Sequence, residues 1–194
     1  MSHRDQTIAE LLSGIASARV APAGGSGAAI VGAIGAALCE MTCIHTGNES
    51  RSEAADLAAV GDDLRRQRTH LLNLADTDAS LVDELFAGPD GAMDDSEIKR
   101  SVGVPLTIAE ACLNVLDLAI EVTASGDKNA VLDAGTGVHL VHAALQASVL
   151  TARSNLDQLS DRSFVSTVQR RVTEIAASGD ESYRQALANV ENRS

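Results

Sequence analysis

The stretch from residue 21 to residue 38 constrains this chain more than any other, because a glycine-rich loop leads directly into a run of small residues. The loop reads Ala-Pro-Ala-Gly-Gly-Ser-Gly at positions 21–27. Pro22 stiffens the approach, Gly24 and Gly25 permit close backbone contact, and Ser26 is a favoured N-cap. The sequence predicts a tight loop that opens a helix, whose N-terminus is suited to bind an anion; an ordinary loop is the alternative.

The helix that follows the loop is predicted to have one flat face. Ala28, Gly32 and Ala36 are spaced four apart, which places them on the same side of a helix. A face of such small residues lets another backbone come close. It could serve a neighbouring helix of the same chain or a partner subunit.

The composition predicts one globular domain over residues 1–194 with an aliphatic core. Apolar residues make up 45% of the 194 residues and aromatic residues only 2%. The net charge of −12 argues against nucleic acid or an anionic membrane as a partner. Lysine occurs only at Lys99 and Lys128, so the acidic surface fits a halophilic protein, with an ordinary acidic enzyme as the alternative.

The three cysteines, Cys39, Cys43 and Cys112, form no disulfide framework, since their number is odd. We interpret them as small buried residues and expect no metal site, although Cys39, Cys43 and His45 form a conceivable one. The N-terminus shows no signal-peptide pattern, and residues 28–38 are shorter than the ~20 apolar residues of a membrane span. A cytoplasmic protein that binds no membrane is therefore expected.

Apolar residues recur at helical spacing along the whole chain, and no segment alternates with a β period. A capping box of Thr7 and Glu10 starts the first predicted helix. The second runs from about 26 to about 45 and ends at residues 46–48. A Ser50–Glu53 capping box opens a long third helix, which Gly88-Pro89 ends. A flexible loop is expected from 89 to 95.

The fourth predicted helix starts near residue 94 or 96, is kinked at Pro105 with a free carbonyl, and closes at residues 125–128. Asn129 is predicted to cap a fifth helix, which continues to about residue 159. A sixth begins between 161 and 163, with a break near Ser178-Gly179. The chain is therefore predicted to be all-α, a single-domain bundle of about six helices.

Two carboxylates draw attention within this pattern. Asp78 falls on the apolar stripe of the long third helix, where a carboxylate needs a partner or a function; Asp76 points away and is expected to be solvated. Asp133 lies near the start of the fifth helix beside Gly135 and Gly137. Glycine inside a helix costs about 1 kcal/mol relative to alanine, so close approach of a helix or a ligand is expected there.

These motifs occur in a distinctive order: the Pro-x-Gly-Gly-Ser loop, the Asp-x-Asp pair at 76–78, Val-Pro-Leu at 104–106, and Asn-x-x-x-Asp-Ala-Gly at 129–135. In this order and spacing, the chain from Thr7 to about Phe164 resembles the cyclodeaminase/cyclohydrolase family of folate enzymes. That family includes the cyclodeaminase half of formiminotransferase-cyclodeaminase and stand-alone methenyltetrahydrofolate cyclohydrolases.

The resemblance implies an all-helical homodimer with folate bound near the subunit interface and no cofactor beyond that substrate, which carries an anionic polyglutamate tail. It implies catalytic roles for Asp133 and Asp78. The substrate-binding residues it implies are Pro22, Gly24, Gly25, Ser26, Pro105, Asn129 and Asn155. Three positions depart from the family pattern: Ala23 replaces a glycine, Leu132 a serine and Thr151 an asparagine.

Either family reaction needs a base and an acid, and carboxylates in a partly dry pocket can supply both. We expect methenyltetrahydrofolate cyclohydrolase activity, with formiminotetrahydrofolate cyclodeaminase and a non-catalytic helical dimer as alternatives. Asp78 could instead pair with an arginine, and Asp133 could merely stabilise its helix.

Other charged groups are interpreted as surface residues. His139 and His142 are expected to be ordinary helix-face residues, and His45 to lie at a helix end. Arg65, Arg66 and Arg68 form the densest cationic cluster, which is either a solvated helix face or a contact for the folate tail.

Overall fold

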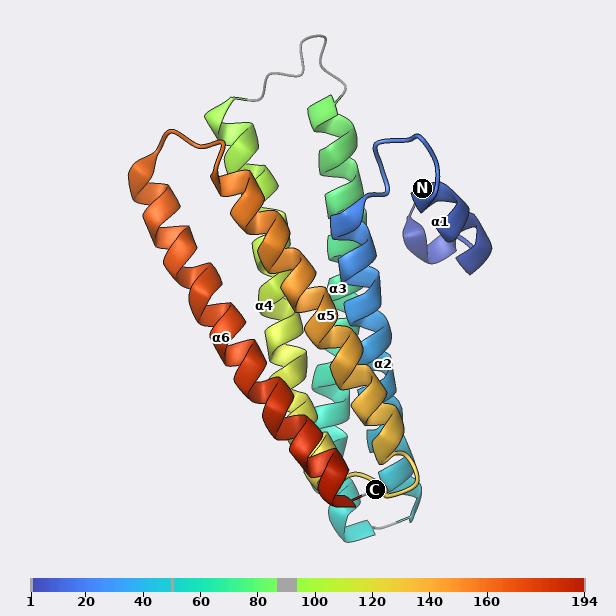
Figure 1. The fold of residues 1–194 in the computed structure, drawn as a ribbon. Coiled ribbons are helices and arrows are strands. Elements are labelled where there is room, and N and C mark those ends of the chain that lie inside the picture. Colours follow the sequence, from blue (N-terminus) through green and yellow to red (C-terminus); the bar gives the residue numbers. More distant parts are fainter. Residues whose placement is uncertain (1, 50, 87–93, 194) are drawn as a thin grey trace.

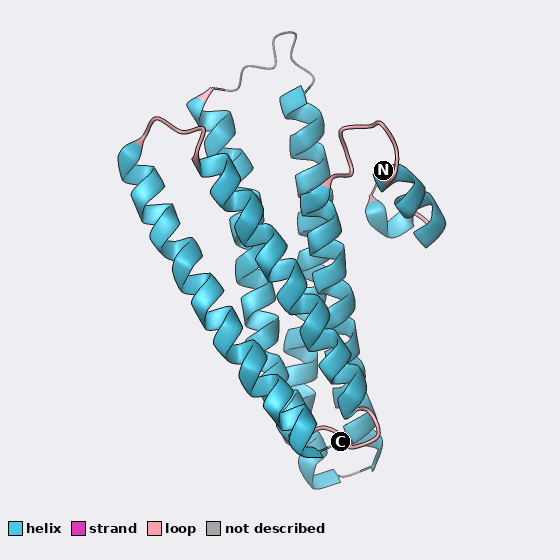
Figure 2. Ribbon diagram, viewed as in Figure 1, coloured by secondary structure: helices cyan, strands magenta, loops and turns pink. Residues whose placement is uncertain are grey.

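The structure is a computed structural model that describes residues 2–49, 51–86 and 94–193. Within these ranges every regular element is helical (Figure 2). The elements, in chain order, are a 3-10 turn η1 (His3–Asp5), α1 (Ile8–Ile15), α2 (Gly24–Glu49), α3 (Arg51–Phe86), α4 (Asp95–Ser125), α5 (Val131–Leu156) and α6 (Arg162–Arg193). The prediction of an all-α bundle of about six helices is confirmed.

The five long helices alternate in direction, so each is antiparallel to the one before it (Figure 1). Helix α2 packs against α3 and α5, while α4 packs against α3, α5 and α6. The bundle therefore has two layers, with α2, α5 and α6 in one and α3 and α4 in the other. The short α1 stands apart beside the N-terminal half of α2 (Figure 1).

The first helix boundaries agree with the sequence, and those of α2 do not. The capping box of Thr7 and Glu10 precedes α1 as predicted. Helix α2 begins at Gly24, so Ser26 lies inside its first turn and is not the N-cap. It also continues through residues 46–48 to Glu49, where Thr46 donates to the Thr42 carbonyl inside the helix. Ser50, the Ser50–Glu53 capping box and the Gly88-Pro89 stop lie outside the described residues or side chains.

The later helices bring further corrections. Asp94 caps α4 in a capping box with Glu97, close to the predicted start. Asn129 does not cap α5: the N-cap is Ala130, which makes no side-chain bond, and the Asn129 side chain bonds Asp127 instead. Helix α5 ends at Leu156, earlier than predicted. Helix α6 has no break at residues 178–179.

Glycines allow α2 and α5 to touch backbone to backbone. A Cβ at Gly137 would lie 2.6 Å from the Gly35 carbonyl oxygen, and a Cβ at Gly135 would lie 3.2 Å from Val190. A Cβ at Gly32 would lie 3.0 Å from the Cys112 Sγ. The flat face of α2 therefore packs inside its own chain, contrary to the partner-subunit alternative, and the glycines of α5 leave no wall open for a ligand.

The core is aliphatic, and the three cysteines belong to it as predicted. Cys39, Cys43 and Cys112 are free and buried. Burial raises the pKa of Cys39 and Cys112 to about 12 and that of Cys43 to about 11. By length and composition, α2 and α4 could each cross a membrane, but 56% and 44% of their most apolar windows are buried inside the bundle, which is also typical of core helices.

Candidate active site

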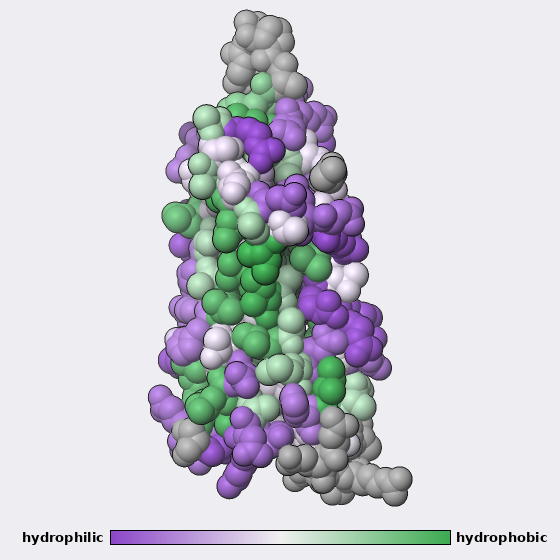
Figure 3. Space-filling model, turned by 90° about the vertical axis from the view of Figure 1, so that its right-hand side faces the viewer, coloured by the Kyte–Doolittle hydropathy of each residue, from purple (hydrophilic) through white to green (hydrophobic). Residues whose placement is uncertain are grey.

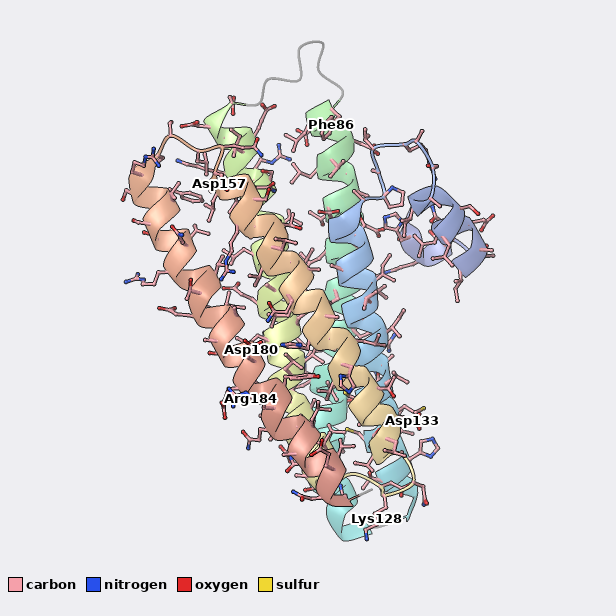
Figure 4. The ribbon with its side chains drawn as sticks, viewed as in Figure 1. Phe86, Lys128, Asp133, Asp157, Asp180 and Arg184 are labelled. Atoms are coloured by element: carbon pink, nitrogen blue, oxygen red, sulfur yellow. The ribbon has the colours of Figure 1, made fainter. Side chains whose placement is uncertain are left out.

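Except for Asn129, the predicted substrate-binding residues lie toward the end of the bundle where α2 begins and where α3 and α5 end. A cleft of about 300 Å³ opens there, beside Phe86, which is labelled at the top of Figure 4. Its lining comes from four segments and comprises Ala23, Gly24, Gly25, Asp78, Leu81, Val82, Leu85, Phe86, Ser101, Thr151, Asn155 and Gln158. Small-molecule sites usually start at about this volume.

A second, larger groove lies on the other side of α3, between α3 and α4. Its volume is about 660 Å³, and Leu81 borders both spaces. Leu74, Leu81 and Val104 line it together with the polar side chains of Asp76, Thr77, Ser80 and Thr107. The Arg100–Glu84 ion pair (2.8 Å) lies at one side. The cleft therefore adjoins enough open volume for a ligand larger than one ring system.

Asp78 is the central polar group of the cleft. Its side chain is only 7% exposed. It lies on the apolar face of α3, where most neighbouring side chains carry no charge. The fully buried Ser26 hydroxyl donates a hydrogen bond of 2.8 Å to the Asp78 Oδ2. Burial raises the pKa of the Asp78 carboxyl, while hydrogen bonds from the Ser26 side chain and backbone and the charge of His3 act against that rise.

This environment suits a carboxylate that exchanges protons. No arginine or lysine among the described residues pairs with Asp78, so the structural ion-pair interpretation has no support here. Its hydrogen-bond partners belong to the first turn of α2, whose N–H groups have no acceptor within the helix. Asp78 therefore closes one side of a helix N-terminus that faces the cleft.

The glycines of the loop have different reasons for being glycine. A Cβ at Gly25 would overlap the carboxylate of Asp78, so only glycine allows Asp78 to approach α2. A Cβ at Gly24 would meet nothing within 4 Å. Because Gly24 is exposed and lines the cleft, its bare backbone is open to a ligand.

Asn155 and Pro105 are joined through a backbone carbonyl. Pro105 is buried inside α4, which continues through it without interruption. Proline has no N–H to donate to the carbonyl four residues earlier, which is that of Ser101. Asn155 Nδ2 donates to this oxygen at 2.7 Å. Asn155 thus borders the cleft while its amide satisfies the carbonyl that Pro105 leaves free.

Asp76 is not solvated, contrary to the prediction. Ser2 Oγ donates to its Oδ2 at 2.6 Å, and the His3 N–H donates to its Oδ1 at 2.7 Å. Partial burial acts to raise the pKa of Asp76, but these hydrogen bonds and the charges of His3 and Arg4 lower it. The N-terminal residues are therefore held against α3, two residues from Asp78.

Asn129 and Asp133 lie at the opposite end of the molecule, where α5 begins (Figure 4). Both are exposed. The sequence analysis assigned Asp133 and Asp78 to one catalytic site. Within one chain the structure does not bring them together. Whether Asp133 takes part in catalysis stays a prediction.

The remaining charged candidates have partners elsewhere. Arg65 and Arg68 both bind the buried Glu40, at 2.8 and 2.9 Å, and Arg66 pairs with Asp63. Among the described residues, no three His, Cys, Asp or Glu side chains form a group that could hold a metal ion.

His139 and His142 join α5 to α6 through the single tyrosine of the chain. The Tyr183 hydroxyl is 2.9 Å from His139 Nδ1, and its ring stacks on His142 with centroids 4.1 Å apart. The Nε2 of His142 also meets Asp180 at 2.8 Å. These histidines hold two helices together, far from the cleft.

Sequence reasoning missed the N-terminal contact with Asp76, the apolar lining from the end of α3, and the partner of Asn155. The partner of Asn155 could have been found, because the position of Pro105 identifies Ser101 as the residue whose carbonyl needs a donor. The contact of the N-terminus with Asp76 could not, because Ser2 and His3 show no sequence pattern.

The geometry defines an antiparallel all-helical bundle with a buried carboxylate at a glycine-rich helix N-terminus. Residues 7–174 match the family model of formiminotransferase-cyclodeaminase, and the chain belongs to this family. It is 32% identical over 174 residues to a methenyltetrahydrofolate cyclohydrolase of Methylorubrum extorquens, covering 82% of this chain and 84% of that protein. Its fold matches the crystal structure of a formiminotetrahydrofolate cyclodeaminase from Thermotoga maritima, with a TM-score of 0.91, 20% identity, and coverage of 97% and 98%.

Proposed function

We propose that this protein is a methenyltetrahydrofolate cyclohydrolase, which hydrolyses methenyltetrahydrofolate to formyltetrahydrofolate. The observation that carries the proposal is Asp78, a buried carboxylate with a raised pKa beside an open helix N-terminus. The similarity to the Methylorubrum extorquens cyclohydrolase supports this reaction over others of the family.

The substrate carries a positively charged amidinium carbon between two folate nitrogens. A carboxylate next to this cation stabilises it and can take a proton from the attacking water. The water oxygen bonds to the carbon and yields a neutral carbinolamine. The bond from that carbon to one nitrogen then breaks, that nitrogen gains a proton, and the formyl group stays on the other. One proton is released overall.

In this mechanism Asp78 is the base and the bond from Ser26 orients it. The bare backbone at Gly24 leaves room for the planar pterin to lie against the first turn of α2. The N–H groups of that turn can bind a carbonyl or carboxylate of the substrate. We assign the polyglutamate tail no contact with Arg65 or Arg68, because Glu40 already binds both.

We further propose that the protein is a homodimer paired through α2. Figure 3 shows a hydrophobic band along the side of the molecule where α2 lies. Ile34 and Ile44 of α2 are 50% and 52% exposed. Between Gly24 and Gly47 the only acidic or basic side chain apart from His45 is Glu40, which is buried. A face without charged side chains lets two copies of a chain of net charge −12 meet without repulsion at the contact.

An antiparallel pairing across this face would assign Asp133 a place in the site. A two-fold axis at the middle of α2 brings the end of one copy next to the beginning of the other. The beginning of α2 borders the Asp78 cleft, and its end lies beside the beginning of α5, where Asp133 and the 61% exposed Leu132 are. Each site would then combine Asp78 of one copy with Asp133 of the other.

Subunit mixing tests this composite site. Asp78→Asn and Asp133→Asn should each be almost inactive, but a heterodimer of the two has one intact site. Unfolding and refolding them together at equal amounts should restore about a quarter of wild-type turnover, the share expected from random pairing. No recovery, or a monomeric wild type in light scattering, contradicts the composite site.

The cyclodeaminase reaction is the second candidate, because the fold matches a formiminotetrahydrofolate cyclodeaminase. Purified protein should be given methenyltetrahydrofolate and, separately, formiminotetrahydrofolate, while methenylfolate absorbance is followed. Loss of absorbance with the first substrate supports the cyclohydrolase. A gain with the second, with release of ammonia, supports the cyclodeaminase. No change with either supports a non-catalytic helical dimer.

We expect the reaction to need no cofactor and no metal, so dialysis against a chelator should leave turnover unchanged. The free buried thiols are consistent with a reducing, cytoplasmic environment. Because the chain carries a net charge of −12, nucleic acid and anionic membranes are not expected partners.

A further inference from the structure

Helix α1 is a formed helix that the rest of its own chain leaves almost uncovered. Among the described residues, none of the extensive helix–helix contacts of the bundle involves it, and it stands beside the beginning of α2 (Figure 1). Of its eight residues, only Gly14 is buried. Isolated helices shorter than about 12–15 residues are marginal in water, so α1 needs packing that its own bundle does not supply.

The uncovered side of α1 is apolar. Ile8, Leu12 and Ile15 are spaced by four and three residues, which places them on one face of the helix. They are 77%, 58% and 40% exposed. The only charged side chain of the helix is Glu10, whose carboxylate bonds Thr7 in the capping box. We call Ile8, Leu12 and Ile15 the α1 stripe; it is a surface without charge.

The chain on both sides of α1 is fastened to the bundle. Before it, Ser2 and His3 bond Asp76 of α3. Arg4 donates to α3 one to two turns earlier along that helix. After it, Ala21 is buried. Helix α1 is therefore a fixed part of the surface, and the α1 stripe is presented at one place.

Most of the exposed large apolar side chains belong to α1, α2 and the loop between them. Among the described residues nine such side chains are exposed, and six lie between residues 8 and 44: Ile8, Leu12, Ile15, Val20, Ile34 and Ile44. Helix α2 contributes only two of them, which is little for a stable interface of roughly 800 Å² per partner. Helix α1 and the loop add the other four, so the face proposed above for pairing continues onto α1.

The two-fold pairing through α2 determines what α1 meets. Because an axis at the middle of α2 sets the beginning of one copy beside the end of the other, α1 lies opposite the end of α2 in the second copy. At that end Thr42 Oγ1 donates to the Ala130 carbonyl at 3.1 Å, so α2 touches the beginning of α5. Two residues beyond each side of this contact are Ile44 and Leu132, both exposed.

We infer that α1 docks on a second copy of this chain, where the α1 stripe packs against Ile44 and Leu132. This inference rests on the pairing proposed above and not on the reaction. The side chains that meet are all apolar and uncharged, so two acidic chains can join there without repulsion at the contact. A membrane fits less well, because membrane-surface helices carry lysine and arginine on their polar face, and Ile8–Ile15 contains neither.

Leu12→Ser tests the docking through the assembly state. A symmetric dimer loses the leucine twice, so its dissociation constant, measured by analytical ultracentrifugation, should rise about a hundredfold. Leu150→Ser is the matched control. Leu150 is 69% exposed but lines a groove between α5 and α6, so its loss should leave the dissociation constant unchanged.

Cross-linking tests the docking site itself. Treatment of Leu12→Cys/Ile44→Cys with a short bismaleimide should yield a covalent dimer on a denaturing gel. Leu12→Cys alone should not, because the two copies of α1 lie at opposite ends of the dimer, and neither should Leu12→Cys/Leu150→Cys. The native cysteines are buried, and burial raises the pKa of each thiol, so they react slowly.

A monomeric wild type overturns the inference, as does a dissociation constant that Leu12→Ser leaves unchanged. Absence of the covalent dimer between residues 12 and 44 overturns it too. Binding of neutral lipid vesicles that Leu12→Ser abolishes, with dimerisation unaffected, makes a membrane the occupant and also contradicts it. A dimer with the expected cross-link but no turnover of either folate supports the inference and removes the proposed reaction.

Discussion

The two ends of α2 border two regions that look alike in sequence and differ in structure. At one end, α2 begins with Gly24 and Gly25, and the carboxylate of Asp78 lies beside this first turn. At the other end, α5 begins with Asp133, Gly135 and Gly137. Asp78 is buried and bonded to Ser26, whereas Asp133 is exposed. Glycines at the first end leave space beside a carboxylate, and glycines at the second are filled by neighbouring helices.

This difference shows that glycine near a helix start has no single meaning. Gly137 meets the backbone of α2, so its bare Cα stabilises a helix contact. Gly24 meets nothing within 4 Å, so its bare Cα stabilises no contact in the chain. Gly24 also lines the cleft, so its bare backbone is open to a ligand, whereas that of Gly137 is covered by α2.

The largest expected effect is that of Asp78→Asn on turnover, a loss on the order of a hundredfold or more. The same variant should lose turnover but gain stability relative to the wild type at neutral pH. The pKa of Asp78 is raised by burial, so its ionised form is disfavoured and the stability it contributes at low pH is lost as pH rises through the folded pKa. The melting temperature of Asp78→Asn relative to wild type should therefore increase from pH 4 to pH 7. A structural ion pair predicts the reverse: lower stability and normal turnover.

Three glycine-to-alanine variants should have different effects at the two ends of α2. In Gly25→Ala the new methyl displaces the Asp78 carboxylate, and turnover should fall more than tenfold. In Gly24→Ala the fold should be unaffected and KM should rise. In Gly137→Ala the methyl lies 2.6 Å from the Gly35 carbonyl oxygen, and stability should fall by about 1–3 kcal/mol while turnover per folded molecule is kept. Thermal melts and steady-state kinetics on all three decide whether the ends differ as described.

The next effect isolates the carbonyl that Asn155 satisfies. Asn155→Ala should cost about 1–2 kcal/mol, because the Ser101 carbonyl loses its donor. In a Pro105→Ala background the restored N–H can reach that carbonyl, so the same change should cost less. The difference is a double-mutant cycle measured by urea unfolding. Equal costs in both backgrounds would show that Asn155 acts otherwise.

The smallest effect per residue should be that of salt on stability. With a net charge of −12, surface carboxylates repel one another, and salt screens them. We expect the melting temperature and helicity to fall as potassium chloride is lowered from molar to dilute concentrations. Glucose at the same osmolality should not substitute for the salt. A melting temperature independent of salt excludes a halophilic surface.

The helical class and the burial of Asp78 could be predicted from the periodicity of apolar residues, whereas the common site of the loop and Asn155 followed only from the family resemblance. The bond from Ser26 to Asp78 could not be predicted, since it joins residues 52 positions apart with no shared pattern. The prediction that Asp133 shares a site with Asp78 within one chain was wrong, and the order of the helices could have shown it. Helices of similar length alternate in direction, so α5 must start at the end where α2 stops.

The contact of Tyr183 with His139 and His142 gives this protein an intrinsic fluorescent probe at one defined place. The chain has one tyrosine and no tryptophan, so its intrinsic emission comes from a single ring stacked at the α5–α6 junction. That ring lies away from the cleft, and folate binding adds its absorbance to an almost transparent protein. Detachment of α6 can therefore be followed by emission, independently of events at the site.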